Sequence, residues 1–172
     1  MALQRLSIST GWIFKNANSN DSDFLPVSQF PTTIHQDLLH HEKIVDPFLD
    51  ADELQVQWVG EEAWIYRTRF SKPRVEHENV IYELVFEGLD THSTIFLNSK
   101  EIKRTDNMYL EYRINISELI EEDNELEIRF ESTFLLGKRI EKEAKVKPLF
   151  CHNGDQSRLQ VRKAPYSYGW DW

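Results

Sequence analysis

The sequence predicts an all-β domain, a two-sheet sandwich of the jelly-roll type with little helix. Apolar residues alternate with polar ones in several short segments, and turn-forming residues separate these segments. About eight short strands at regular spacing are typical of sandwich folds. At 172 residues the chain fits one domain with a buried core, so residues 1–172 are expected to fold as a single unit.

Four segments carry the alternation most clearly, and each is expected to form a half-buried antiparallel strand. They span residues 64–70, 80–87, 110–116 and 126–130. The residues that would face the core are Trp64, Tyr66, Thr68 and Phe70; Val80, Tyr82, Leu84 and Phe86; Leu110, Tyr112, Ile114 and Ile116; and Leu126, Ile128 and Phe130. The Arg and Glu residues between them, including Glu127, would then face solvent.

A further strand is expected at residues 91–98. Here Ile95, Phe96 and Leu97 form one apolar run, which is typical of a strand covered on both faces. The run ends at residues 98–100, which predict a hairpin turn because Asn tolerates a positive φ. A second strand should therefore follow directly and pair with the first.

Helix is predicted at only two places. Ser117 is expected to cap a helical turn over residues 117–120. Residues 133–144 contain good helix formers and predict a short helix, which Gly137 interrupts. The last element, residues 147–172, is expected to be a long irregular loop that leads to a terminal Trp-Asp-Trp segment.

Charge and composition exclude several partners. The chain has 29 acidic and 20 basic side chains, and its net charge of −9 opposes a phosphate backbone, so no nucleic-acid partner is expected. No stretch approaches the roughly 20 apolar residues that a membrane helix needs, so no membrane association is expected. The lone Cys151 cannot form an internal disulfide, and the first residues do not resemble a secretory signal. These features favour a cytoplasmic protein, with a vacuolar or lysosomal destination as the alternative.

The sequence contains no motif for metal, phosphate or acyl-transfer chemistry. The six histidines are scattered without zinc-ligand spacing, and neither a Gly-rich phosphate loop nor a Gly-x-Ser-x-Gly motif is present. We therefore predict no metal site and no cofactor. Carboxylates are numerous, but most fall on the polar faces of the predicted strands, where solvation explains them.

The residues at the end of the sequence carry the most specific chemistry. Trp170 and Trp172 flank Asp171. Indole rings can stack on the apolar face of a sugar ring, and a carboxylate can accept hydrogen bonds from its hydroxyls. The segment therefore predicts a sugar-binding surface. The two indoles could instead be hydrophobic anchors between domains.

Residues 162–172 resemble the segment that joins the first domain of the β-mannosidases of glycoside hydrolase family two to the rest of the enzyme. Five earlier stretches agree with that family in order and approximate spacing: residues 34–39, 55–61, 64–67, 85–91 and 105–108. The resemblance thus spans essentially the whole chain. The departures are local, with Asn98-Ser99 in place of the family's Asn-Gly and Asp52-Glu53 in place of its Asn-Glu.

The resemblance implies a galactose-binding-like jelly roll at the N-terminus of a retaining β-mannosidase. Both catalytic glutamates of that family belong to a barrel domain beyond this chain, so the chain alone is expected to contain no catalytic residue and to be inactive. Its expected partners are a terminal β-linked mannose and the remaining domains of the parent enzyme.

By the same resemblance, Trp170 would pack against the mannose and Asp171 would accept its hydroxyl hydrogen bonds. Trp172 is expected to pack beneath them. Arg162 or Lys163 would orient Asp171, and Tyr168 is a further supporting candidate.

The other residues of the matching stretches are interpreted as structural. His35 and Asp37 would accompany apolar neighbours that pack on the sandwich, Trp58 and Trp64 would lie in the core, Gly88 and Asp90 would shape a turn, and Asp106 and Asn107 would brace a loop. The alternative function is a free-standing carbohydrate-binding module without catalysis. A sandwich used only for protein contacts would explain the strands but not the terminal aromatic segment.

Overall fold

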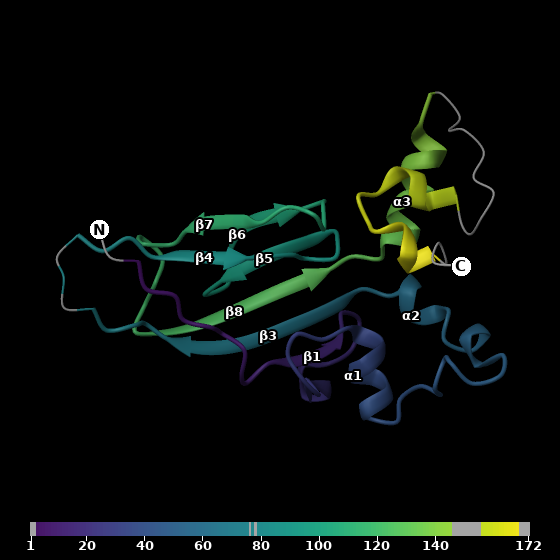
Figure 1. Cartoon of the computed structure of the whole chain (residues 1–172), viewed down its shortest axis with the longest axis horizontal. Helices are drawn as coiled ribbons and strands as arrows, with labels where there is room; N and C mark the ends of the chain where they lie inside the picture. Colours follow the sequence, from purple (N-terminus) through teal and green to yellow (C-terminus); the bar gives the residue numbers. More distant parts are fainter. Residues whose placement is uncertain (1–2, 76, 78, 146–155, 169–172) are drawn as a thin grey trace.

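The computed structural model describes residues 3–75, 77, 79–145 and 156–168, and within them the chain is mostly β-sheet with few helices (Figure 1). The strands are β1 Ile13–Asn16, β2 Leu25–Pro26, β3 Trp64–Ser71, β4 Glu83–Phe86, β5 Ser93–Leu97, β6 Lys100–Thr105, β7 Tyr112–Asn115 and β8 Asp123–Phe130. The helices are α1 Ile34–His40, α2 Trp58–Glu61 and α3 Thr133–Glu143, with short 3-10 helices η1 Asp21–Asp23, η2 Asp52–Leu54, η3 Gln156–Gln160 and η4 Pro165–Tyr168.

Two antiparallel sheets form the sandwich. The larger has six strands in the order β2-β1-β3-β8-β5-β6, and the smaller consists of β4 and β7. The central pair, β3 and β8, is in register from Trp64 opposite Phe130 to Ser71 opposite Asp123. The expected strands at 64–70, 80–87, 91–98, 110–116 and 126–130 are all present with somewhat different ends. The prediction of an all-β fold with little helix is therefore confirmed.

The main core lies between the two sheets and contains the alternating apolar residues. Its buried members are Trp12, Leu84, Leu89, Ile95, Leu97, Ile116, Leu126 and Ile128. Each large apolar side chain buried in this way contributes roughly 1.5–3 kcal/mol. A second buried cluster lies where α1 and α2 meet the larger sheet, and it comprises Phe14, Leu38, Val56, Val59 and Trp64. This second cluster attaches α1 and α2 to the larger sheet.

Two strand predictions need correction. Leu110 is exposed and precedes β7, which begins only at Tyr112. Glu127 is buried instead of solvated. It lies directly opposite Arg67 across the β3–β8 ladder and accepts hydrogen bonds from Arg67 Nη2 at 2.7 Å and Arg129 Nε at 2.6 Å. The paired guanidinium groups satisfy the carboxylate and allow it to be buried.

The β5–β6 hairpin forms at the predicted place. Asn98 and Ser99 both adopt positive φ, 50° and 67°, as a two-residue turn between twisted strands requires. The Asn98 side chain ties the turn to β8, since its Oδ1 accepts from Glu125 N at 2.9 Å. Ser99 makes no such side-chain bond among the hydrogen bonds of the described residues, and its backbone adopts a conformation that favours glycine.

The helical predictions are confirmed in outline and corrected in detail. Residues 133–143 form α3, and the buried Gly137 does not interrupt it. The turn after β7 is closed by a bond of 2.9 Å from Ile120 N to Ile116 O. Ser117 does not cap it, because its hydroxyl accepts from Tyr82 N and so ties the turn to the smaller sheet.

Candidate functional site

The segment that leads to the predicted sugar-binding residues is held against the sandwich by its backbone. Arg162 forms an isolated parallel bridge with Asn107, and Met108 N donates to Arg162 O at 3.1 Å. The buried Ala164 then donates from its backbone N to Met108 Sδ at 2.9 Å. Residues 162–164 therefore run beside the loop that follows β6, and the interpretation of Asn107 as a residue that braces a loop is confirmed.

A side-chain ion pair reinforces this attachment. Lys163 Nζ contacts the carboxylate of Asp90, and the lysine side chain is largely buried in the pair. The sequence predicts only a turn role for Asp90 and gives no indication of this ion pair. The two residues are 73 positions apart, and neither carries a local signal that would have paired them.

The final described turn, η4, is fixed by an aromatic contact. The ring of Tyr168 meets the ring of Phe134 in α3 edge to face, with 5.5 Å between centroids. Phe134 in turn lies against Gly60 of α2, where a Cβ would come within 2.9 Å of Phe134 Cε2. The absence of a side chain at Gly60 therefore lets α2 and α3 approach closely, and Ser132 Oγ adds a 2.7 Å bond to Gly60 O.

The predicted site residues divide into two groups. Trp170, Asp171 and Trp172 lie outside the described residues, so their predicted roles remain predictions. Arg162 and Tyr168 are described, and both belong to the attached segment that precedes those three residues in sequence. The Arg162 side chain is exposed, and its described contacts come from its backbone.

Two residues of α1 have distinct environments, and one of them, His35, lies near this segment. Burial lowers the pKa of His35, and the nearby positive charge of Lys163 lowers it further. Asp37 is fully buried and accepts from Ser28 N at 2.9 Å, Ser28 Oγ at 2.8 Å and Tyr66 Oη at 3.0 Å. Burial, together with the negative charge of Asp37, raises the pKa of Tyr66. The structural interpretation of Asp37 is confirmed.

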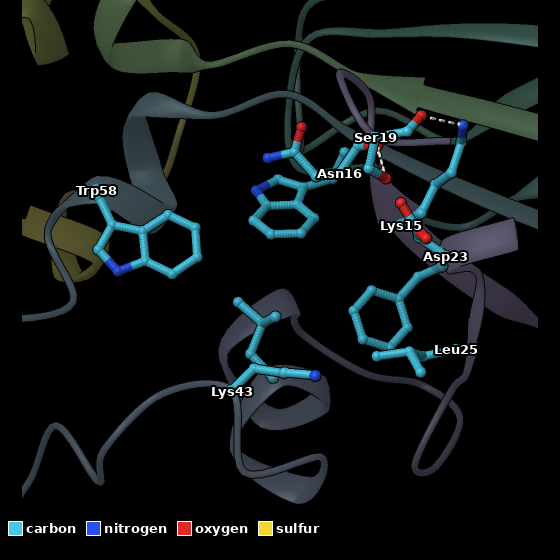
Figure 2. Close-up of a pocket in the computed structure, with 10 residues that line it drawn as sticks. Lys15, Asn16, Ser19, Asp23, Leu25, Lys43 and Trp58 are labelled. Atoms are coloured by element: carbon cyan, nitrogen blue, oxygen red, sulfur yellow. Dashed lines mark hydrogen bonds between the residues drawn. The ribbon is translucent and has the colours of Figure 1, made fainter. Parts of the chain in front are cut away.

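Trp58 does not lie in the core, contrary to the prediction. It opens the short helix α2 and is 41% exposed, whereas Trp64 is buried as predicted. Their rings are 6.2 Å apart and border a hollow of about 270 Å³ that also includes Phe14, Leu38 and Lys43. Figure 2 shows the Trp58 indole across this hollow from Asp23 and Leu25.

The hollow offers little to a polar ligand. Its volume of about 270 Å³ is slightly below the range of about 300 to 1,000 Å³ of ligand pockets. Lys15, on its wall, already donates to Ser19 O at 2.8 Å and pairs with Asp21 at 3.0 Å (Figure 2 shows the first of these bonds). Within the described residues, no group of three His, Cys, Asp or Glu side chains could hold a metal ion, and no helix has the length and apolarity to cross a membrane.

Comparison with known families decides the affiliation of the chain. The sequence model of the family described as glycosyl hydrolase 2 galactose-binding domain-like matches residues 12–172. The chain belongs to this family. The match includes the sandwich, the attached segment and the terminal Trp-Asp-Trp residues, so the galactose-binding-like fold class expected from the resemblance is confirmed.

Individual relatives of this galactose-binding-like domain are β-mannosidases. β-Mannosidase B of Thermothelomyces thermophilus is 46% identical over 97% of the chain, and β-mannosidase B of Aspergillus clavatus is 40% identical over 99% of it. The crystal structure of the β-D-mannosidase from Dictyoglomus thermophilum superposes with a TM-score of 0.81 at 40% identity over 97% of the chain. The chain spans about 20% of the length of each of these three proteins.

Solved structures of lower sequence identity share the fold alone. The exo-chitosanase from Amycolatopsis orientalis superposes with a TM-score of 0.59 over 72% of the chain at 20% identity. The fold is thus shared by proteins with different names. The fold by itself does not select a substrate.

Proposed function

We propose that this chain is the N-terminal domain of a β-mannosidase, which hydrolyses terminal non-reducing β-D-mannose residues from mannosides with retention of configuration. The observation that carries the proposal is the 46% identity to a β-mannosidase over 97% of the chain. Two solved structures that share the fold but have other names, a β-glucuronidase and an exo-chitosanase, are only 16% and 20% identical to the chain.

In this proposal the chain is not catalytic by itself. A retaining glycosidase needs two carboxyl groups about 5 to 5.5 Å apart. The chain spans only about 20% of the length of its relatives. By the family resemblance, the two catalytic glutamates would belong to the remainder of the parent protein. The domain instead contributes one wall of the sugar subsite and a packing surface for the remainder.

The proposed wall consists of Trp170, which packs against the mannose ring, and Asp171, which accepts hydrogen bonds from its hydroxyls. A hydrogen bond to a charged group contributes roughly 1.5 to 3 kcal/mol, enough to influence which sugar binds. The attachment of residues 162–168 supports this role. Tyr168, held against Phe134, precedes Trp170 by only two residues, so the chain approaches the proposed wall from a fixed point.

The deciding experiment measures the size and activity of the native protein. An antibody against this domain would capture it from extracts, and hydrolysis of an aryl β-mannoside would be assayed on the captured material. We expect a product several times heavier than 20.4 kDa that cleaves the β-mannoside and spares the matching β-glucoside. An inactive product of 20.4 kDa that binds glycans would instead indicate a carbohydrate-binding module. Cytoplasmic localisation belongs to the same proposal, and fractionation of the extract tests it.

A further inference from the structure

The segment between α1 and α2 exposes an unusual number of large apolar side chains. Phe48 is 94% exposed and Leu54 is 69% exposed. Val45, Leu49 and Trp58 are exposed as well. Single exposed apolar residues are common, but several together on one segment mark an interaction surface. We call residues 45–58 the docking segment.

The backbone of the docking segment is ordered by its own hydrogen bonds. Phe48 N donates to Asp46 Oδ1 at 3.0 Å, Asp52 N to Leu49 O at 3.0 Å, and Gln57 Nε2 to Glu53 O at 2.8 Å. The exposed side chains are therefore presented by successive turns. A surface that is ordered before binding loses less conformational entropy on association.

The same segment is anchored to the domain at its C-terminal end. Val56, within it, and Val59, just after it, are buried in the cluster that contains Phe14 and Trp64. The apolar residues of this part of the chain thus divide into a buried set and an exposed set. The buried set accounts for the attachment of the segment. In the exposed set, Trp58 contacts Trp64 with part of its ring, whereas Phe48 and Leu54 present most of their surface to solvent.

The docking segment lies at the end of the molecule where the described chain finishes. It runs into α2, where Gly60 packs against Phe134 of α3, and Phe134 contacts Tyr168. Figure 1 shows the segment before α2, α3 and the yellow C-terminal segment at the same end of the sandwich. The last described residues therefore lie at the same end of the sandwich as the docking segment (Figure 1).

We propose that the docking segment is the surface on which the polypeptide that follows this domain packs in the parent enzyme. The inference rests on the proposed function, because it requires a longer parent. The relatives supply the length of that polypeptide, since the chain spans only 20% of them. Four acidic residues, Asp46, Asp50, Asp52 and Glu53, are interspersed with the exposed apolar residues. The surface that covers the segment therefore combines an apolar recess for Phe48 with a basic rim.

The test measures the chemical accessibility of single thiols in the full-length parent protein. Phe48→Cys and Ile81→Cys would each be made in a background in which Cys151 and every other cysteine of the parent are replaced by serine. Each variant would be labelled with a maleimide, and each rate would be divided by the rate in denaturant. Ile81 is the matched control, since it is 57% exposed and precedes β4 in the smaller sheet, outside the docking segment. Without a covering surface, position 48 should react at least as fast as position 81.

If the inference is correct, position 48 reacts about tenfold more slowly than position 81, because labelling then requires the interface to open. Equal rates would overturn it. Leu54→Cys repeats the test should Phe48→Cys prevent folding, which circular dichroism would reveal. Protection that disappears on dilution would assign the surface to a second copy and also overturn the inference. Hydrolysis of an aryl β-mannoside by the same samples reports separately on the proposed function.

Discussion

Tyr66 donates a hydrogen bond of 3.0 Å from its phenolic oxygen to Oδ2 of Asp37, whose side chain is completely buried. Tyr66 belongs to β3 and Asp37 to α1, so this bond joins the helix to the centre of the larger sheet. The other carboxylate oxygen of Asp37 accepts two bonds from Ser28. A buried carboxylate is tolerated here because three donors replace its water.

Removing the phenolic hydroxyl should therefore destabilise the domain. We expect Tyr66→Phe to lower the free energy of unfolding by about 1.5 to 3 kcal/mol, as for other hydrogen bonds to a charged group. Urea unfolding of the chain measures the change. Tyr109→Phe is the control, since Tyr109 is exposed, and it should change stability little. Equal effects of the two substitutions would contradict this account of Asp37.

Acid should destabilise the domain partly through His35. Burial and, secondarily, Lys163 lower the pKa of His35 in the folded state. A histidine with a lowered folded pKa contributes stability above its unfolded pKa of about 6.5, and this contribution is lost as the pH falls below that value. The pKa of His92 is lowered too, chiefly by burial, so it adds to the same loss.

We accordingly expect the Tm of the chain to fall between pH 7 and pH 5, and His35→Gln to make that fall smaller. His77→Gln, at an exposed position, should leave the pH dependence unchanged. Thermal unfolding at a series of pH values measures both. An unaltered pH profile in His35→Gln would show that His35 is not the titrating group.

The hairpin turn offers a stabilising substitution. Ser99 adopts a φ of 67°, a conformation that costs roughly 1 to 2 kcal/mol for a residue with a side chain. Because glycine also loses more entropy on folding, Ser99→Gly should stabilise the domain by about 0.5 to 1 kcal/mol. Lys100→Gly, in the adjacent β6, should instead destabilise it by a similar amount. Chemical unfolding distinguishes the two signs.

The ion pair between Lys163 and Asp90 should influence sugar binding if residues 162–168 position the proposed wall. Asp90→Asn in the full-length parent should lower kcat/KM for an aryl β-mannoside by about twofold to fivefold, which corresponds to a partly exposed ion pair. Exchange of the two residues, Asp90→Lys with Lys163→Asp, should restore part of the loss. If Asp90→Asn leaves kcat/KM unchanged and the exchange of the two residues restores nothing, the ion pair does not position the site.

Asp171 should have a larger effect than its supporting residues. In the full-length parent, Asp171→Asn should reduce kcat/KM for a β-mannoside about tenfold to a hundredfold, which corresponds to the loss of a charged hydrogen bond. Glu118→Gln, at an exposed position in the turn after β7, is the control and should have little effect. Steady-state kinetics measures both, and wild-type kcat/KM in Asp171→Asn would exclude Asp171 from the subsite.

The sequence by itself determined the β-sheet class, the main strands, the turn at Asn98-Ser99 and the helix after Ser132. These features depend on neighbours along the chain, because alternation with a period of two and turn preferences are local properties. The motifs also led to the family. Their interpretation correctly placed Asp37 and Trp64 in structural roles.

Only the tertiary structure decided which distant residues meet. The burial of Glu127 depends on Arg67 lying opposite it, and the attachment of residues 162–164 depends on Asp90 and the loop after β6. The exposure of Trp58 depends on its position at the start of the short helix α2. Each relationship follows from strand order, register and the packing of α2 against α3. Residues far apart in sequence carry no periodic signal of their pairing, since the free energy of their contact exists only once the chain has folded.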